Sequence, residues 1–166
     1  EKIMRVLIRF RNRNDIVFAF AGGGALLDKL KEYKKRNHMD NVLFIPYQEK
    51  KNLIYSLNAA DIHWVVNAKG IKGISVPSKL YGIMAAGKPV IGLLENGTEG
   101  RMIIEDAHCG FVSGPGNENS IERLIYQVLE HKDELKDMGM AGRRYLEENL
   151  SKKVSIERYL KEITTT

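Results

Sequence analysis

The sequence predicts an α/β domain: a doubly wound parallel sheet, Rossmann-like, with helices on both faces. Short apolar runs typical of strands alternate with amphipathic helical runs along nearly the whole chain. Strands that alternate with helices pair in parallel through right-handed crossovers. The length of 166 residues suits one domain with an ordinary core. No linker, repeat or low-complexity segment divides the chain, so residues 1–166 are expected to form a single domain.

Five strands are expected from apolar runs that end at turn-forming residues. These runs are 16–21, 42–45, 61–66, 89–94 and 110–113. The first run is apolar at every position and is therefore expected to be buried on both faces. Gly22–Gly24 ends it, and Pro46 ends the second run.

Helices are expected where apolar residues recur three or four positions apart. They are predicted at 3–8, 26–36, 50–58, 77–86, within 97–107, from 120 onward, and twice more before the end of the chain. Pro77 near the start and Gly87 just past the end suit the helix 77–86. Ser120 is expected to cap the helix that follows it.

The chain opens inside a helix, whereas a doubly wound domain normally begins with its central strand. This observation predicts a truncated first strand and a sequence that is a fragment of a longer protein.

The net charge of +5 is concentrated in the first third of the chain. Residues 1–51 carry 12 Lys or Arg and 6 Asp or Glu, and residues 52–166 carry 14 and 15. Such a surplus suits nucleic acid, an anionic membrane or a phosphorylated ligand, although a solvated lysine-rich helix face is the simpler interpretation. The single Cys109 excludes an internal disulfide, and no apolar run reaches the ~18 residues of a membrane span. No secretory signal pattern is visible, and a cytoplasmic location is expected.

Ligands of open α/β sheets bind beyond the carboxyl ends of the strands, where four loops are expected: 22–24, 46–49, 67–78 and 95–100. The third loop is the most informative because it combines glycines with Lys69 and Lys72 and runs into a helix at Pro77 and Lys79. Free amides and partial positive charge at a helix start, together with lysines, suit a diphosphate. A flexible surface loop with solvated lysines is the alternative.

Other candidates are weaker. Gly22–Gly24 lacks the dinucleotide fingerprint because Leu27 stands where a third glycine belongs, so a tight turn is favoured. Tyr47 is suited either to stack on a base or to cover the edge of the core. Trp64 and Cys109 are interpreted as core residues. His38, His63, His108 and His131 show no ligand spacing, and no residue arrangement identifies a catalytic group or a metal site.

Six segments in this order carry a family pattern: 18–24, 42–47, 53–62, 76–91, 109–112 and 138–143. The most specific is 76–91, VPSKLYGIMAAGKPVI. Together they resemble the C-terminal, donor-binding domain of GT-B glycosyltransferases in retaining family 4, the glycosyl transferases group 1. The Pro77-Ser78-Lys79 version is similar to enzymes that build O-antigen, capsule or colanic acid.

The resemblance implies transfer of a sugar from a nucleoside diphosphate donor to a saccharide or a lipid-linked saccharide. It implies retention of anomeric configuration, no metal, no cofactor besides the donor, and no nucleic-acid partner. Lipid-linked acceptors allow peripheral association with the inner face of the membrane. The base is expected near Pro46 and Tyr47, and the diphosphate at the start of the helix. The donor-binding residues carried over are Gly23, Gly24, Pro46, Tyr47, Ser75, Val76, Pro77, Ser78, Lys79 and Leu80.

The family pattern has two glutamates in this region, and the sequence has Ile74 and Gly82 at the matching positions. The second glutamate usually holds the ribose hydroxyls, so ribose recognition must come from elsewhere. The N-terminal acceptor domain and the basic residues after the first strand are also absent, and this chain alone is expected to bind a donor without turning it over.

Three alternatives remain. A non-catalytic nucleotide-binding module is favoured by the absent glutamates. One half of a nucleotide-sugar 2-epimerase would need a carboxylate in the loop 70–76, which has none. An NAD-binding domain would need a full glycine fingerprint and an acidic residue after the next strand, where Pro46-Tyr47-Gln48 stands and Glu49 follows.

Overall fold

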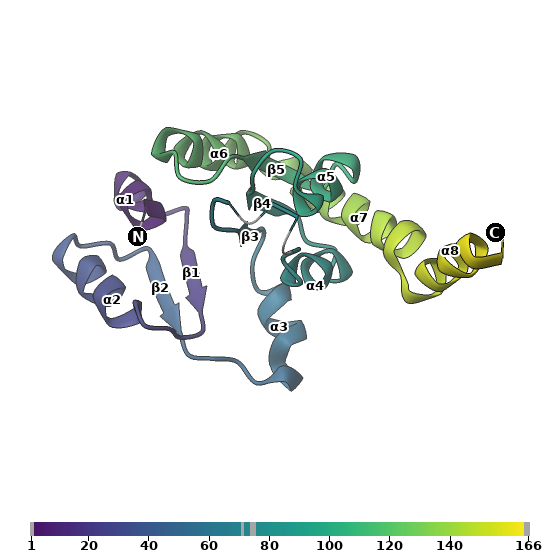
Figure 1. Cartoon of the computed structure of the whole chain (residues 1–166). Coiled ribbons are helices and arrows are strands. Elements are labelled where there is room, and N and C mark those ends of the chain that lie inside the picture. Colours follow the sequence, from purple (N-terminus) through teal and green to yellow (C-terminus); the bar gives the residue numbers. More distant parts are fainter. Residues whose placement is uncertain (1, 71, 74–75, 165–166) are drawn as a thin grey trace.

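The computed structural model describes residues 2–70, 72–73 and 76–164 and shows an α/β fold (Figure 1). In chain order the elements are α1 (Lys2–Leu7), η1 (Ile8–Phe10), β1 (Phe18–Ala21), α2 (Leu27–Arg36), β2 (Val42–Ile45), η2 (Lys50–Asn52), α3 (Leu53–Asn58), β3 (His63–Val66), α4 (Lys79–Ala85), β4 (Val90–Leu93), α5 (Glu99–Asp106), β5 (Gly110–Ser113), α6 (Glu118–Glu130), η3 (Lys132–Glu134), α7 (Leu135–Tyr145), η4 (Leu146–Leu150) and α8 (Lys152–Thr164). Every strand pair is parallel, which confirms the predicted fold class.

The strands form two sheets, β1-β2 and β3-β4-β5, rather than the single sheet expected. The N–H groups of Phe18 and Gly22 donate to β2 and its flanks, so those of Ala19 and Ala21 point to the other edge of β1. His63 and Asn67 donate toward β4, which leaves the N–H groups of Trp64 and Val66 on the other edge of β3 in the same way. Within the described ranges no segment hydrogen-bonds to both of these edges, so the parallel strands form two sheets.

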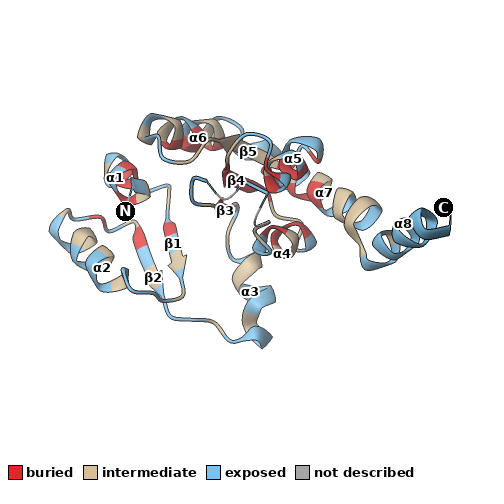
Figure 2. Ribbon diagram, in the orientation of Figure 1, coloured by how far each residue is buried: buried red, intermediate tan, exposed pale blue. Residues whose placement is uncertain are grey.

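One hydrophobic cluster nevertheless spans both sheets. Phe18 and Val42 come from the first sheet, Ile91 and Leu93 from the second, and α1 and α6 cover them from one side. A second cluster lies between β3, β4, α4 and α5 (Figure 2). Burial of apolar surface therefore holds the two sheets in one body without hydrogen bonds between them.

The first strand is buried on one face only, so the prediction of burial on both faces is wrong. Phe18 is buried and Phe20 half-buried, whereas Ala19 and Ala21 are exposed and Val17 is 62% exposed. Side chains of a strand alternate between its two faces, and the second face of β1-β2 lacks a covering layer within the described residues (Figure 2).

Helix ends differ in detail from the sequence expectation. Asn117, not Ser120, caps α6: its Oδ1 accepts from the backbone N–H groups of Asn119 (3.0 Å) and Ser120 (3.4 Å). Asparagine at this position satisfies amides that have no partner inside the helix, which places Ser120 within the first turn.

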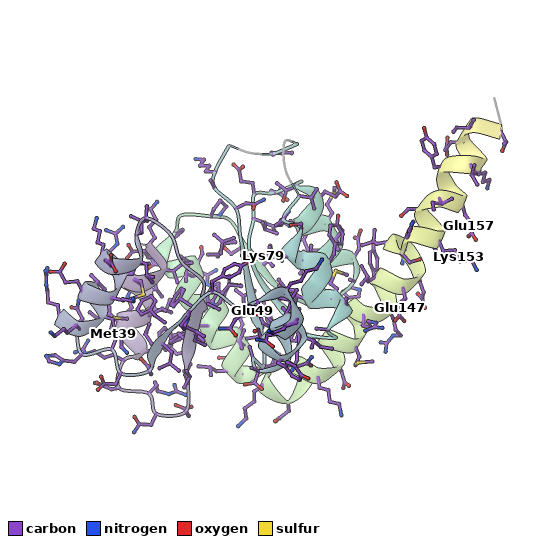
Figure 3. The ribbon with its side chains drawn as sticks, turned by 90° about the horizontal axis from the view of Figure 1, so that it is seen from below. Met39, Glu49, Lys79, Glu147, Lys153 and Glu157 are labelled. Atoms are coloured by element: carbon purple, nitrogen blue, oxygen red, sulfur yellow. The ribbon has the colours of Figure 1, made fainter. Side chains whose placement is uncertain are left out.

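The last helix, α8, extends away from the body (Figures 1 and 3). Ile156, Tyr159, Leu160 and Ile163 lie exposed along it. No helix in the described part of the chain is both long and apolar enough to cross a bilayer.

Candidate functional site

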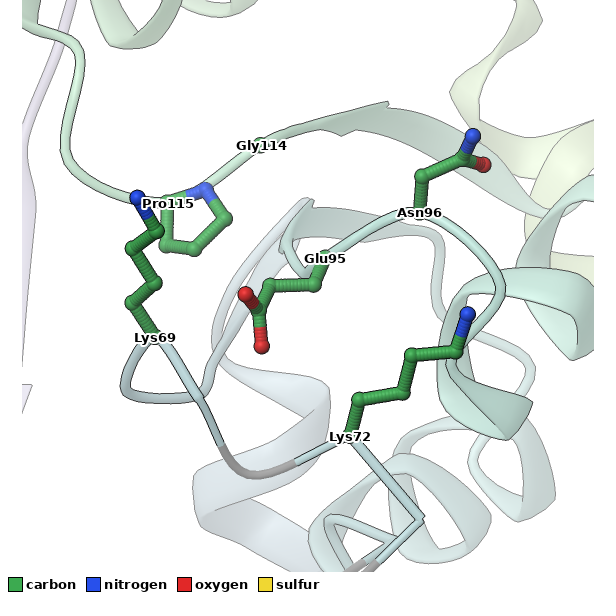
Figure 4. Close-up of a pocket in the computed structure, with 6 residues that line it drawn as sticks. All are labelled: Lys69, Lys72, Glu95, Asn96, Gly114 and Pro115. Carbon is green, nitrogen blue, oxygen red and sulfur yellow. The ribbon is translucent and has the colours of Figure 1, made fainter.

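A pocket of about 350 Å³ lies beyond the carboxyl ends of β3, β4 and β5 (Figure 4). Its lining residues are Lys69, Lys72, Glu95, Asn96, Gly114 and Pro115. Two of the four predicted loops, 67–78 and 95–100, thus contribute residues to one pocket. The loop at 114–115 was missed, although Gly114-Pro115-Gly116 directly after a strand is a turn signal that marks another loop at the same edge.

Glu95 makes two hydrogen bonds at this pocket. Its Oε2 accepts a hydrogen bond of 2.8 Å from the backbone N–H of Gly70. Its backbone oxygen accepts one of 2.8 Å from Oγ1 of the buried Thr98. The residue sits directly after β4, where Leu94 N–H donates to Ser113 O. The Glu95 carboxylate therefore connects the loop 67–78, which carries Lys69 and Lys72, to the loop that follows β4.

The two lysines of the pocket carry positive charge without a counter-ion. Among the described residues, no carboxylate lies within salt-bridge distance of Lys69 or Lys72. The ammonium of Lys72 lies against Gly97, where an added Cβ would stand 2.6 Å from Nζ. Lys69 extends toward Pro115 (Figure 4). The arrangement is suited to an anionic group that enters the pocket.

The start of α4 presents Ser78 and Lys79. Ser78 is the N-cap residue but makes no side-chain cap hydrogen bond. Lys79 stays exposed to solvent, yet neighbouring protein atoms desolvate its ammonium and lower its pKa. No acidic side chain in the described ranges pairs with it. A lysine without a counter-ion at a helix start suits a phosphate.

The neighbours of Lys79 have packing roles as well. Leu80 is fully buried, and its N–H donates to Pro77 O at 2.9 Å, so this amide already has a partner. Pro77 and Val76 are half-buried, and an added Cβ on Gly100 would stand 3.1 Å from Pro77 Cδ. Ser75 and Ile74 lie outside the described residues.

The described members of the predicted donor-binding set are all absent from the lining of this pocket, and four of them lie at the ends of β1 and β2. A Cβ on Gly23 or Gly24 would meet nothing within 4 Å, so their backbone is open to close approach. Pro46 is exposed, and Tyr47 is 83% exposed. This exposure excludes the interpretation that Tyr47 covers the edge of the core. The ring of Tyr47 is therefore free to stack on a base.

Trp64 and Cys109 lie in the hydrophobic clusters, as predicted, and His63 is half-buried. Nε2 of His63 lies 2.8 Å from Leu57 O, and burial lowers the pKa of this histidine. Cys109 is fully buried, and desolvation raises the pKa of its thiol to about 12. Trp64 packs half-buried against the core. Across the described ranges no three His, Cys, Asp or Glu side chains gather as metal ligands.

Parallel strands with polar loops gathered beyond their carboxyl ends define an open α/β domain of the doubly wound class. The family model described as Glycosyl transferases group 1 matches residues 2–145, and the chain belongs to this family. This finding bears out the resemblance to the glycosyl transferases group 1.

Two curated relatives support the assignment. The chain is 31% identical over 162 residues to WbjE of Pseudomonas aeruginosa, named a probable glycosyltransferase, covering 96% of this chain and 39% of the relative. It is 25% identical over 168 residues to WcaI of Escherichia coli, provisionally named a glycosyl transferase of colanic acid biosynthesis, covering 98% and 39%. The chain thus spans about two fifths of the length of these relatives.

Solved glycosyltransferase structures share the fold. HepE of Anabaena, in complex with UDP and glucose, matches with a TM-score of 0.73 at 16% identity over 99% of this chain and 44% of that one. WaaG, a glycosyltransferase of lipopolysaccharide biosynthesis, matches with 0.70 at 17% identity, over 98% and 42%. TarM of S. aureus, in complex with UDP and saccharide compounds, matches with 0.75 at 19% identity, over 96% and 31%. The neighbours are GT-B glycosyltransferases, and at these identities the likeness concerns the fold.

Proposed function

We propose that the chain is the donor-binding domain of a glycosyltransferase that moves a sugar from a nucleoside diphosphate to a saccharide or lipid-linked acceptor during surface polysaccharide synthesis. The family match over residues 2–145 carries this proposal. The name of WcaI points to a polysaccharide pathway, and the HepE and TarM complexes contain UDP. Retention of configuration, independence from metal and membership of family 4, in the branch with Pro77-Ser78-Lys79, belong to the proposal.

The donor is arranged across the strand ends in this proposal. The base stacks near Pro46 and Tyr47, whose exposure leaves room for it. The diphosphate lies against Ser78 and Lys79 at the start of α4, with Gly23 and Gly24 facing the same cleft. The charge on the leaving diphosphate grows as the sugar departs, and a lysine without a counter-ion stabilises that charge.

The domain is completed by a further parallel strand between β1 and β3. The amides of Ala19, Ala21, Trp64 and Val66 point to the two free edges, and the order 3-2-1-4-5-6 of doubly wound sheets places the first strand at this position. The proposal also includes an acceptor-binding domain, since the chain spans only about two fifths of the length of its curated relatives. The 166-residue chain alone then binds a donor but transfers no sugar.

A non-catalytic nucleotide-binding module is the second candidate. Gly82 on α4 has no carboxylate where the family places the glutamate that holds ribose. Such a module would bind a nucleotide sugar and leave it intact.

Calorimetric titration of the intact protein with UDP, GDP and ADP, and with sugars linked to each, tests the proposal. We expect one nucleoside diphosphate series to bind, and a product to form when a polysaccharide precursor is added. Binding of NAD in their place, or no nucleotide binding at all, would refute the proposal. Binding without sugar transfer to any acceptor supports the module, and epimerisation of the donor without an acceptor supports the epimerase alternative.

A further inference from the structure

We propose that Glu95 is the residue that recognises hydroxyl groups of the transferred sugar, from the pocket beyond β3, β4 and β5. This inference rests on the proposed function and names a specificity residue outside the predicted donor-binding set. Its basis is the chemistry of the pocket, the free oxygen of the carboxylate, and the position of the pocket along the sheet.

The pocket is an open hollow with the volume of a small-molecule site. Its volume of about 350 Å³ falls in the range of about 300–1,000 Å³ for such sites. Lys69 and Lys72 supply positive charge from one loop, Glu95 and Asn96 supply hydrogen-bond acceptors from a second, and Gly114 and Pro115 close it from a third. A sugar joined to a phosphate carries both groups that this lining matches, an anion and several hydroxyls.

One oxygen of Glu95 is available to a ligand. Oε2 is engaged by Gly70 N–H, whereas Oε1 has no partner among the described residues. An ionised carboxylate only accepts hydrogen bonds, and sugar hydroxyls donate them. Because Thr98 and Gly70 fix the backbone and the carboxylate, the free oxygen is held in place before a ligand arrives.

The lysines leave this carboxylate available. Neither Lys69 nor Lys72 forms a salt bridge with Glu95. Their ammonium groups point toward Pro115 and toward the loop before α5, away from the carboxylate (Figure 4). A ligand in the pocket therefore meets the negative and positive groups separately, and each can bind a different part of it.

The positions of the strands indicate whether Glu95 binds hydroxyls of the ribose or of the transferred sugar. Tyr47 follows β2, Lys79 follows the loop after β3, and the pocket lies at β3, β4 and β5. The proposed base site thus lies at the sheet β1-β2, and the proposed diphosphate site and the pocket lie at the sheet β3-β4-β5. A nucleotide sugar has the sequence base, ribose, diphosphate, sugar, so the group beyond the diphosphate is the sugar and not the ribose.

The test compares Glu95→Gln with the wild type of the intact protein by calorimetry. The ligands are the nucleoside diphosphate that binds in the titrations above and its sugar-linked form. Glutamine keeps an oxygen to accept from Gly70 N–H but loses the charge, so the loop stays tied. We expect the nucleotide sugar to bind about tenfold more weakly, with the affinity for the nucleoside diphosphate unchanged. Glu130→Gln, at the last residue of α6, is the matched control and should change neither affinity.

Donors with single hydroxyls removed from the sugar give the second arm. One of them should bind wild type and Glu95→Gln equally, because the missing hydroxyl is the partner of Glu95. An equal loss for the nucleoside diphosphate and the nucleotide sugar would assign Glu95 to ribose or to the loop tie alone and overturn the inference. So would an unchanged affinity for the sugar-linked form. Failure of the wild type to bind any nucleoside diphosphate would instead refute the proposed function itself, and this inference with it.

Discussion

A Cβ atom added to Gly139 in α7 would lie 2.1 Å from the carbonyl oxygen of Gly87, just after α4. The opposing atoms are backbone, so they cannot turn away as a side chain would. We expect Gly139→Ala to lower the free energy of unfolding by about 3 kcal/mol, at the upper end of overpacking effects. Urea denaturation measures the change.

Gly82→Ala is the matched control for that substitution, because it also lies inside a helix. Its Cβ would meet only Leu57, at 3.9 Å. Alanine favours helix over glycine, so we expect a gain of about 0.5–1 kcal/mol. Destabilisation of equal size in both variants would show that the close approach of α7 to Gly87 is not the cause.

Lys79→Ala should weaken nucleoside diphosphate binding while the fold stays intact. A charged hydrogen bond contributes about 1.5–3 kcal/mol, and the exposure of Lys79 favours the lower end, or roughly tenfold in Kd. Titration calorimetry gives the affinity and circular dichroism verifies the fold. Lys152→Ala, on α8, is the control with unchanged affinity. An unaltered Kd in Lys79→Ala would remove this lysine from the site.

Stability should depend on pH through His63. Burial lowers the pKa of His63 in the folded protein below the ordinary value of a histidine, about 6.5, so the unfolded chain binds the proton more readily. Stability is therefore full above about pH 6.5 and is lost as the pH falls below that value. We expect the unfolding free energy of wild type to drop more steeply between about pH 7.5 and 5.5 than that of His63→Gln, whose amide can still donate to Leu57 O.

The pH profile of wild type must be compared with that of His63→Gln, because the pKa of His131 shifts in the opposite direction to that of His63. A hydrogen bond to Glu134 raises the pKa of His131, and this effect is common to both. Parallel pH profiles for wild type and His63→Gln would contradict a proton-linked role for His63.

The free edges of β1 and β3 should be paired in the intact protein. If a parallel strand lies between them, the amides of Ala19, Ala21, Trp64 and Val66 will exchange with solvent as slowly as that of Phe20, which faces β2. Hydrogen exchange followed by mass spectrometry or NMR measures these rates. Fast exchange at all four positions, with Phe20 protected, would exclude the proposed strand.

Much of the fold could be predicted from local patterns. The runs 42–45 and 110–113 coincide with β2 and β5, because a short apolar run bounded by turn residues is typical of a buried strand. The helix start near Pro77 follows from proline's fixed φ, although regular helix begins at Lys79. The α6 cap was wrong by three residues, since either Asn117 or Ser120 can accept from free amides and only the actual backbone path selects one.

The site was predicted in outline and missed in detail. Loops that follow neighbouring parallel strands lie at the same edge of a sheet. The proximity of the loops 67–78 and 95–100 therefore follows from the predicted order of strands and helices. Glu95 was not singled out, because a glutamate after a strand is usually a solvated surface residue. Its hydrogen bond to Gly70, 25 positions away, becomes visible only once the two loops are folded together.

The amino-acid sequence by itself determined the α/β class, the parallel pairing and the family, because these follow from the order of apolar runs and from a specific motif at 76–91. Tertiary structure alone decided that β1 and β3 do not pair with each other, that one face of the first strand is open within the described residues, and that Glu95 lies between two lysines. Those features depend on which distant segments come to lie beside one another, and local periodicity carries no information about that.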